Sequence, residues 1–252
     1  MRNRPLNRLV IFLLASSVML SGCVTLYNPA TERRESYLID TRQEVELGRN
    51  MDAELRKQMK FVTDPRQNRR LIDIGNRIAE VSDRQDLTYH FFIVEDKDLN
   101  AFAIPGGYIY VHSGLMQAAN DAELAGVLAH EIGHIAARHS VKQLQTVMGY
   151  QIVLGIITGV SGTDSINGAL NIVFNLVNLG YSRQDEFLAD KLAVRYARRA
   201  GFSPLGLVTF FQKLQNEAEA RGPSLKLVFL SSHPPTEQRI LRIEEEMRLP
   251  SN

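Results

Sequence analysis

The chain of 252 residues contains a single cysteine, Cys23, so it cannot form an intramolecular disulfide even in an oxidising compartment. Runs of basic residues are also absent, and the formal net charge is only +1, so nothing indicates nucleic-acid binding. Internal repeats and low-complexity segments are missing as well, which excludes a solenoid. The ordinary apolar fraction of 44% predicts one globular domain with a substantial core.

The N-terminal segment has the pattern of a secretory signal. Three arginines precede an apolar stretch, residues 9–20, that is too short to span a bilayer comfortably. Leu20-Ser21-Gly22-Cys23 then resembles a bacterial lipobox, in which the cysteine is lipidated and becomes the mature N-terminus. We therefore expect a lipoprotein signal peptide over residues 1–22, followed by a lipidated Cys23 and a tether over residues 23–40. The alternative is an incidental cysteine beside an ordinary signal peptide.

The most informative segment is His130-Glu131-Ile132-Gly133-His134. Two histidines four residues apart lie on one face of a helix, close enough to bind one metal ion. The glutamate beside the first histidine can reach a water held on that metal. The spacing therefore indicates metal-assisted hydrolysis of a peptide bond. The alternative is two surface histidines on an ordinary helix.

The residues around this motif predict a helix over residues 121–138, with Asn120 or Asp121 as N-cap and apolar residues at helical spacing. Gly133 in its middle costs about 1 kcal/mol relative to alanine, so we expect another element to pack closely at that turn. His139 lies off the face of the two histidines, and we expect it at the surface.

A zinc hydrolase needs a third protein ligand, which should come from another segment. The best candidate is Glu186, in a stretch that predicts a helix from Ser182, as N-cap, to Gly201. Glu186 and Asp190 are four residues apart and share a helix face. One carboxylate can therefore bind the metal while the other accepts a bond from a ligand histidine or an arginine. The alternative is a solvated acidic helix start.

Capping residues and hydrophobic periodicity predict the remaining elements. We expect helices over residues 42–61, 65–81, 203–220 and 236–248, a strand over residues 87–94, and two short extended runs on either side of residues 105–107.

Taken in order, the motifs resemble those of the gluzincin peptidases that include HtpX and the CAAX prenyl protease. The blocks that carry the resemblance are NAFAIPGGYIYV (100–111), HEIGH (130–134), SRQDEFLAD (182–190) and SHPP (232–235). The similarity covers residues 40–245 and is closest to small lipoprotein members of bacterial envelopes. It implies a single metallopeptidase domain over residues 41–252. The implied fold is zincin-like α+β, mainly α, with a small sheet beside the HExxH helix.

The resemblance also implies one zinc ion per chain, bound by His130, His134 and Glu186, with Glu131 as general base. Manganese or cobalt would suit the same ligands.

Three further residues take part in the implied site. Asp190 would orient a metal ligand, and Arg183 would pair with Asp190 or contact substrate. His233, in the SHPP block, has two readings. It could stabilise the transition-state oxyanion, or it could occupy the open zinc position and hold the enzyme inactive.

In related gluzincins an edge strand next to the metal binds extended substrate through main-chain bonds. The implied strand here is Ala101-Phe102-Ala103-Ile104. The alternative is a plain β-hairpin with residues 108–111.

Two apolar runs lie between residues 147 and 179, where HtpX-like relatives have membrane-spanning helices. Each run is shorter than the roughly 20 residues that a span needs, and four asparagines interrupt the second. We therefore expect a partly buried helical hairpin, with a membrane insertion as the alternative.

The function implied by the resemblance is a zinc endopeptidase that degrades misfolded or stalled envelope proteins. We expect it on the periplasmic side of the outer membrane, since Val24 and not an aspartate follows Cys23. In the lipoproteins that this chain resembles, an aspartate directly after the lipidated cysteine favours retention in the inner membrane. Outer-membrane assembly machinery is a further expected partner. The alternative is an envelope assembly factor or chaperone whose zinc site is normally blocked.

Overall fold

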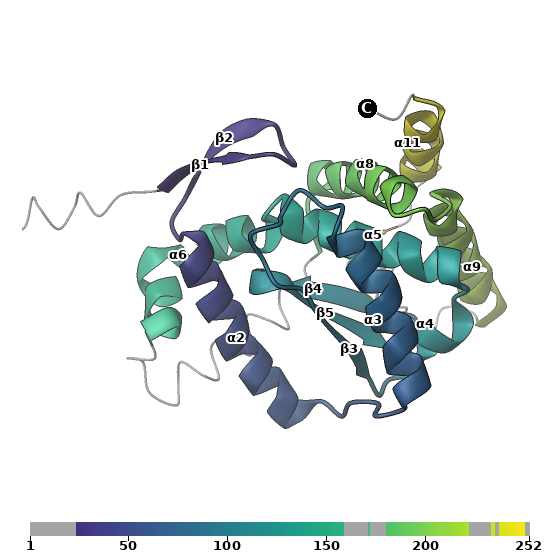
Figure 1. The fold of residues 1–252 in the computed structure, drawn as a ribbon, viewed down its shortest axis with the longest axis horizontal. Coiled ribbons are helices and arrows are strands. Elements are labelled where there is room, and N and C mark those ends of the chain that lie inside the picture. The colour runs from purple at the N-terminus through teal and green to yellow at the C-terminus, as the bar shows by residue number, and fades with distance from the viewer. Residues whose placement is uncertain (1–23, 159–170, 172–179, 222–232, 235–236, 250–252) are drawn as a thin grey trace, which may run out of the picture.

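The computed structural model describes residues 24–158, 171, 180–221, 233–234 and 237–249. Within this part of the chain a small sheet is surrounded by helices (Figure 1), which confirms the expected α+β, mainly helical fold. The helices are α2 (Thr41–Gln58), α3 (Pro65–Ala79), α4 (Ser113–Ala118), α5 (Asp121–Ala136), α6 (His139–Thr158), α8 (Arg183–Arg199), α9 (Leu205–Arg221) and α11 (Glu237–Arg248).

The described sheet that packs on these helices has three strands in the order β3 (His90–Val94), β5 (Tyr108–His112), β4 (Ala101–Ile104). β3 runs parallel to β5, and β4 runs antiparallel to it. The expected strand over residues 87–94 therefore begins three residues later than predicted. A short 3-10 turn joins β4 to β5, and its Gly106 has a φ of 81°, a backbone conformation that favours glycine.

Alternation along β4 divides its side chains between two cores. Ala101 and Ala103 belong to the cluster that also contains the apolar residues of α5, whereas Phe102 and Ile104 belong to the cluster under α2. The alanines are small, so the edge of the sheet can lie close to α5.

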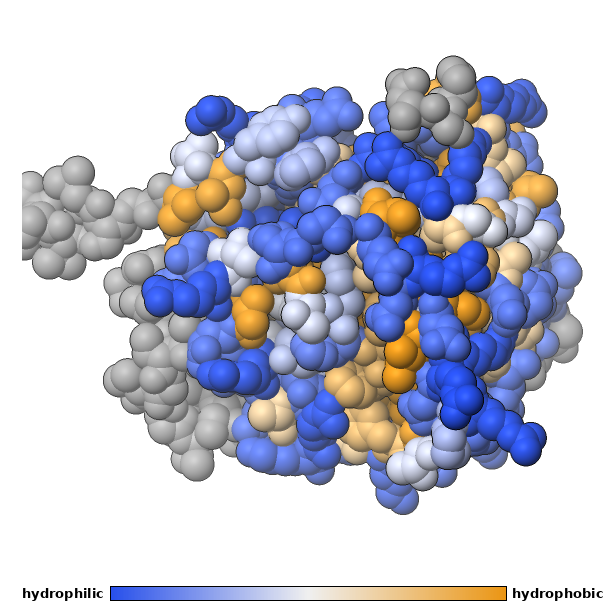
Figure 2. Space-filling model, viewed as in Figure 1, coloured by the Kyte–Doolittle hydropathy of each residue, from blue (hydrophilic) through white to orange (hydrophobic). Residues whose placement is uncertain are grey.

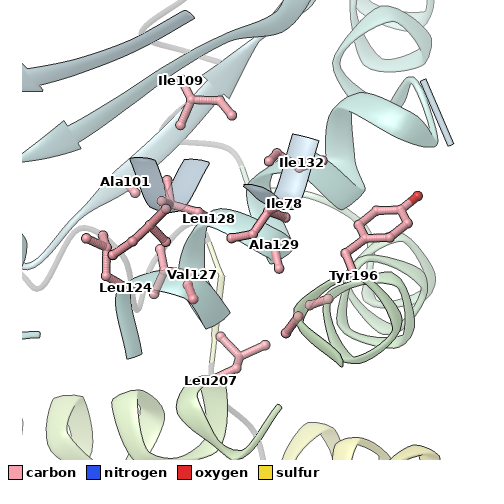
Figure 3. Close-up of a cluster of buried hydrophobic side chains, with 14 of the residues drawn as sticks. Ile78, Ala101, Ile109, Leu124, Val127, Leu128, Ala129, Ile132, Tyr196 and Leu207 are labelled. Atoms are coloured by element: carbon pink, nitrogen blue, oxygen red, sulfur yellow. The ribbon is translucent and has the colours of Figure 1, made fainter. Parts of the chain in front are cut away.

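Helix α5 carries the HExxH motif and is buried on every side from Glu123 to Ala136. Its side chains meet Ile78 of α3, Ile109 of β5, Tyr196 of α8 and Leu207 of α9 (Figure 3). A helix enclosed in this way has little freedom to move, which keeps the motif in a fixed position. The N-cap is Asn120, whose side chain accepts a hydrogen bond from the Glu123 backbone in a capping box.

Two glycines let neighbouring helices approach α5. A Cβ on Gly133 would lie 3.0 Å from the carbonyl oxygen of Ala189 on α8, which confirms the close packing expected at this turn. A Cβ on Gly126 would lie only 2.5 Å from the backbone nitrogen of Leu207 on α9. α5 is therefore held between the backbones of α8 and α9.

The segment that follows Cys23 is not the tether that the sequence suggested. It forms an antiparallel hairpin, β1 (Val24–Asn28) with β2 (Arg33–Tyr37), which packs on the domain. Tyr37 is fully buried under the guanidinium of Arg138, 4.0 Å from its ring centroid. The Arg138 Nη2 also donates a hydrogen bond to the carbonyl oxygen of Ile39 at 3.1 Å. The prediction of a tether was wrong because the aromatic and β-branched residues of this short segment favour strands.

The expected helical hairpin over residues 147–179 lies largely outside the described residues. Helix α6 is described as far as Thr158. None of the helices in the described part of the chain is long and apolar enough to cross a membrane. On the face shown in Figure 2, hydrophobic residues occur in separate patches on a mainly hydrophilic surface.

Candidate metal centre

Four side chains from three segments bring ligand atoms together at the centre of the molecule. His130 and His134 come from α5, Glu186 comes from α8, and His233 comes from the segment before α11. All four are buried, and one ligand atom from each lies within 4.8 Å of the others. Helix spacing explains the first pair, whose Nε2 atoms are 3.0 Å apart.

Most of the distances between these atoms suit a tetrahedral zinc ion, while the His130–His134 and Glu186–His233 contacts, at 3.0 Å and 2.9 Å, are shorter. Ligands at 2.0–2.2 Å from zinc are separated from one another by roughly 3.3–3.6 Å. The His130 Nε2 atom lies 3.3 Å from His233 Nδ1 and 3.5 Å from Glu186 Oε2. The Glu186 Oε1 atom lies 3.4 Å from His134 Nε2 and 2.9 Å from His233 Nδ1. Imidazole nitrogens and a carboxylate that converge in a buried site are the ligand types that zinc takes in hydrolases, so the residues fit zinc.

Asp190 lies behind the cluster and bridges it to α11. Its Oδ1 is 3.0 Å from His130 Nδ1, so the opposite nitrogen of that ring is directed at the cluster. Arg239 of α11 contacts both oxygens of Asp190 and also forms an ion pair with Glu186 Oε2 at 2.7 Å. The two buried carboxylates are therefore balanced by a buried guanidinium.

The expectation that Arg183 pairs with Asp190 is wrong, because Arg239 occupies that place. Arg183 is exposed at the first position of α8. Asp190 lies seven positions further along the helix, a rise of about 10.5 Å.

Glu131 lies beside the donor cluster. It is 1% exposed, and neither carboxylate oxygen has a hydrogen-bond partner in the described structure. His233 Nε2 lies 3.6 Å from Oε1. Burial raises the pKa of Glu131, so its carboxylate binds a proton more strongly than an exposed one. A buried carboxylate that makes no hydrogen bond and lies next to a metal site has the properties of a general base.

The two helix histidines differ in how they hold protons when the metal is absent. Burial lowers the pKa of His134 to about 3, so this ring stays neutral, as a metal ligand must. Burial acts in the same direction on His130, but its contacts with Asp190 and Glu186 outweigh burial and raise its pKa to about 9.

The strand proposed for substrate binding is an edge strand of the described sheet. β4 pairs with β5 on one side and contacts α5. Its side chains, Ala101 to Ile104, are all buried, with at most 6% exposed.

Two residues of the site were not found from the sequence. His139, expected at the surface, is 2% exposed and reaches His134 (Nδ1 to Nδ1, 2.9 Å), because the chain turns sharply between α5 and α6. Arg239 was overlooked, although it shares the buried face of α11 with Ile243, four residues further on. A charged residue on the apolar face of a helix is the signal that could have revealed it.

Comparison with known proteins agrees with this geometry. The profile of peptidase family M48 matches residues 65–247. Metalloprotease LoiP of Escherichia coli is 33% identical over 182 residues, which are 71% of this chain and 70% of LoiP. Metalloprotease YcaL of the same organism is 29% identical over 71% of this chain and 69% of its own.

The beta-barrel assembly-enhancing protease of E. coli is 28% identical over 211 residues, or 79% of this chain. The match covers only 42% of that relative, so its remaining length has no counterpart in the comparison.

Proposed function

Because the chain belongs to peptidase family M48 and is therefore a zinc metalloendopeptidase, we propose that it degrades misfolded or stalled proteins of the bacterial cell envelope. The observation that carries the proposal is the presence of a buried Glu131 carboxylate, with no hydrogen bond in the described structure, beside four converging metal donors. The name of the E. coli beta-barrel assembly-enhancing protease supports outer-membrane proteins and their assembly machinery as substrates and partners.

His130, His134 and Glu186 hold the zinc ion in this proposal, and Asp190 keeps the His130 ring in place. When bound, zinc polarises a water molecule and the scissile carbonyl. Glu131 removes a proton from the attacking water and later delivers it to the leaving nitrogen of the peptide. Because the Glu131 carboxylate is shielded from bulk water, the proton that it takes up stays within the site.

Substrate binds in extended form along β4. The strand lies at the edge of the described sheet beside α5, so a peptide can add to its unpaired side through main-chain hydrogen bonds. Because the four residues are at most 6% exposed, the edge must be uncovered before a peptide binds. Recognition through main-chain hydrogen bonds discriminates little between sequences. It requires an unfolded segment, which suits an enzyme that removes misfolded proteins.

The enzyme is anchored to the periplasmic side of the outer membrane through a lipid on Cys23, after removal of residues 1–22. The lipobox pattern and the Val24 that follows it support this location. The peptidase domain then extends over residues 41–252, with the β1–β2 hairpin packed on it next to the anchor.

His233 fills the fourth position of the site and holds the enzyme inactive until substrate or a partner displaces it. Its Nδ1 lies within 3.3 Å of both His130 and Glu186, at a distance suited to a fourth zinc ligand. The same contacts favour a second candidate function, an assembly factor or chaperone whose zinc site is permanently closed. Proteolysis by the intact chain separates the two functions.

The substrate class is tested with residues 24–252 and one equivalent of zinc. An outer-membrane β-barrel protein is offered unfolded from urea, and in parallel folded in detergent. We expect cleavage of the unfolded form only. Equal cleavage of both forms would contradict recognition of extended segments, and no cleavage of either would favour the chaperone.

A further inference from the structure

His139 is a buried histidine next to the metal site that the chemistry above does not use. Its Nδ1 lies 2.9 Å from Nδ1 of His134, and the two ring planes are inclined at 71°. On its other side, His139 Nε2 lies 3.3 Å from Asp185 Oδ1. A line of contacts therefore runs from the ligand His134 through His139 to the first turn of α8.

The backbone brings His139 to this place by a turn directly after the catalytic helix. α5 ends at Ala136, and Arg138 has a φ of 57°, so the chain changes direction before α6 begins at His139. Arg138 is held there by its ion pair with Glu44 at 2.8 Å. A continued helix would have carried His139 to the opposite side of α5.

The donor and acceptor roles along this line follow from the metal site. If His134 offers the lone pair of Nε2 to zinc, its neutral ring carries the proton on Nδ1. Nδ1 of His139 must then accept that proton in a hydrogen bond, so the proton of His139 sits on Nε2 and faces Asp185. Asp185 accepts a hydrogen bond from the Ser182 hydroxyl through Oδ2 at 2.6 Å, so Oδ1 faces His139 Nε2, with which it makes a 3.3 Å contact but no hydrogen bond.

We propose that His139 is a positioning residue for zinc binding, which holds the His134 ring with its Nε2 directed at the metal. His139 orients the His134 ring as Asp190 orients the His130 ring. The difference is that the group in contact with His134 is an imidazole, and the carboxylate, that of Asp185, contacts this imidazole instead of the ligand. Tyr181 supports the same ring by stacking on it at 3.9 Å. The inference rests on the proposed metal ligands and adds a residue that the HExxH spacing does not reveal.

Zinc affinity tests this role without any measurement of activity. Residues 24–252 with His139→Ala should bind zinc about 10- to 100-fold more weakly than wild type, measured by competition with a chelating dye. His139→Asn keeps an acceptor near the Nδ1 position and should restore most of the affinity. His112→Ala, a buried histidine of β5 outside the cluster, is the matched control and should bind zinc as wild type does.

An unchanged affinity in His139→Ala would overturn the inference, and so would equal losses in the alanine and asparagine variants. Failure of the wild type to bind zinc would instead overturn the proposed metal site. The protonated nitrogen of His139 gives a second test that needs no variant. Long-range ¹H–¹⁵N NMR correlation spectra of the zinc-loaded wild type should show His139 neutral with its proton on Nε2, and a proton on Nδ1 would contradict the proposal.

Discussion

Arg239 contacts both carboxylate oxygens of Asp190, through Nε at 2.7 Å and Nη2 at 2.6 Å, and both side chains are about 2% exposed. This bidentate pair connects α11 to the back of the metal cluster. Because Asp190 in turn contacts His130, the position of a metal ligand depends on a helix that lies more than a hundred residues later in the sequence. Removal of either side chain should lower the free energy of unfolding considerably, because each charge is buried and is compensated by the other.

Replacement of Arg239 should destabilise the fold strongly. Arg239→Met keeps much of the side-chain volume but removes the guanidinium that pairs with both Asp190 and Glu186, which lowers the free energy of unfolding by about 3–5 kcal/mol. Chemical denaturation of the metal-free protein measures this loss. Arg242→Met is the control, because Arg242 lies on the exposed side of the same helix, and it should change stability by less than about 0.5 kcal/mol. Similar losses in both variants would contradict the role of the pair.

The β1–β2 hairpin should contribute to the stability of the domain. Tyr37→Ala removes a fully buried ring and uncovers Arg138, so we expect a loss of about 3–5 kcal/mol in the free energy of unfolding. Tyr27→Ala, in the same hairpin but 60% exposed, should have little effect. A negligible effect of Tyr37→Ala would mean that residues 24–40 behave as the tether first expected from the sequence.

Gly126→Ala should destabilise the protein although alanine is the better helix former. The added Cβ would lie 2.5 Å from the backbone nitrogen of Leu207, and such overpacking costs typically about 1–3 kcal/mol. The gain in helix propensity is about 1 kcal/mol, so we expect a net loss of up to about 2 kcal/mol. Thermal unfolding monitored by circular dichroism measures it. A rise in the melting temperature would show that α9 can move away from α5 without penalty.

His233→Ala should increase the rate at which an unfolded protein is digested. Its imidazole lies among the zinc ligands, and its removal opens the fourth position to water. The measurement compares initial rates of casein digestion at equal zinc content. Loss of activity would instead assign His233 to stabilisation of the oxyanion and would end the inhibitory account.

The local signals of the sequence predicted most of the helices and the sheet around the candidate metal centre, but not the β1–β2 hairpin. Asn120, Asp64 and Ser182 cap the helices that they predicted, and Gly133 does mark the approach of a second helix. The HExxH spacing placed two histidines on one helix face, and the structure brings Glu186 to them. These features depend on residues within a turn or two of each other, or on a short motif with few chemical meanings.

The remaining features depend on contacts between distant segments. His139 faces the site only because Arg138 takes a left-handed conformation beside Glu44, and no helical periodicity predicts that turn. Arg239 is Asp190's partner because α11 packs against α8, whereas Arg183 was chosen for its nearness in sequence. The position of His233 likewise depends on the path of the chain before α11.

The most direct test of the central claim, that Glu131 is the base of a zinc peptidase, is Glu131→Gln in residues 24–252. Glutamine has nearly the same shape but cannot take up a proton, so zinc content should stay at one per chain while digestion of an unfolded protein is lost. Wild-type protein at equal zinc content is the reference, and a His233→Ala background relieves any block of the site. Digestion by the Glu131→Gln protein at the wild-type rate, with zinc bound in both, would contradict the account.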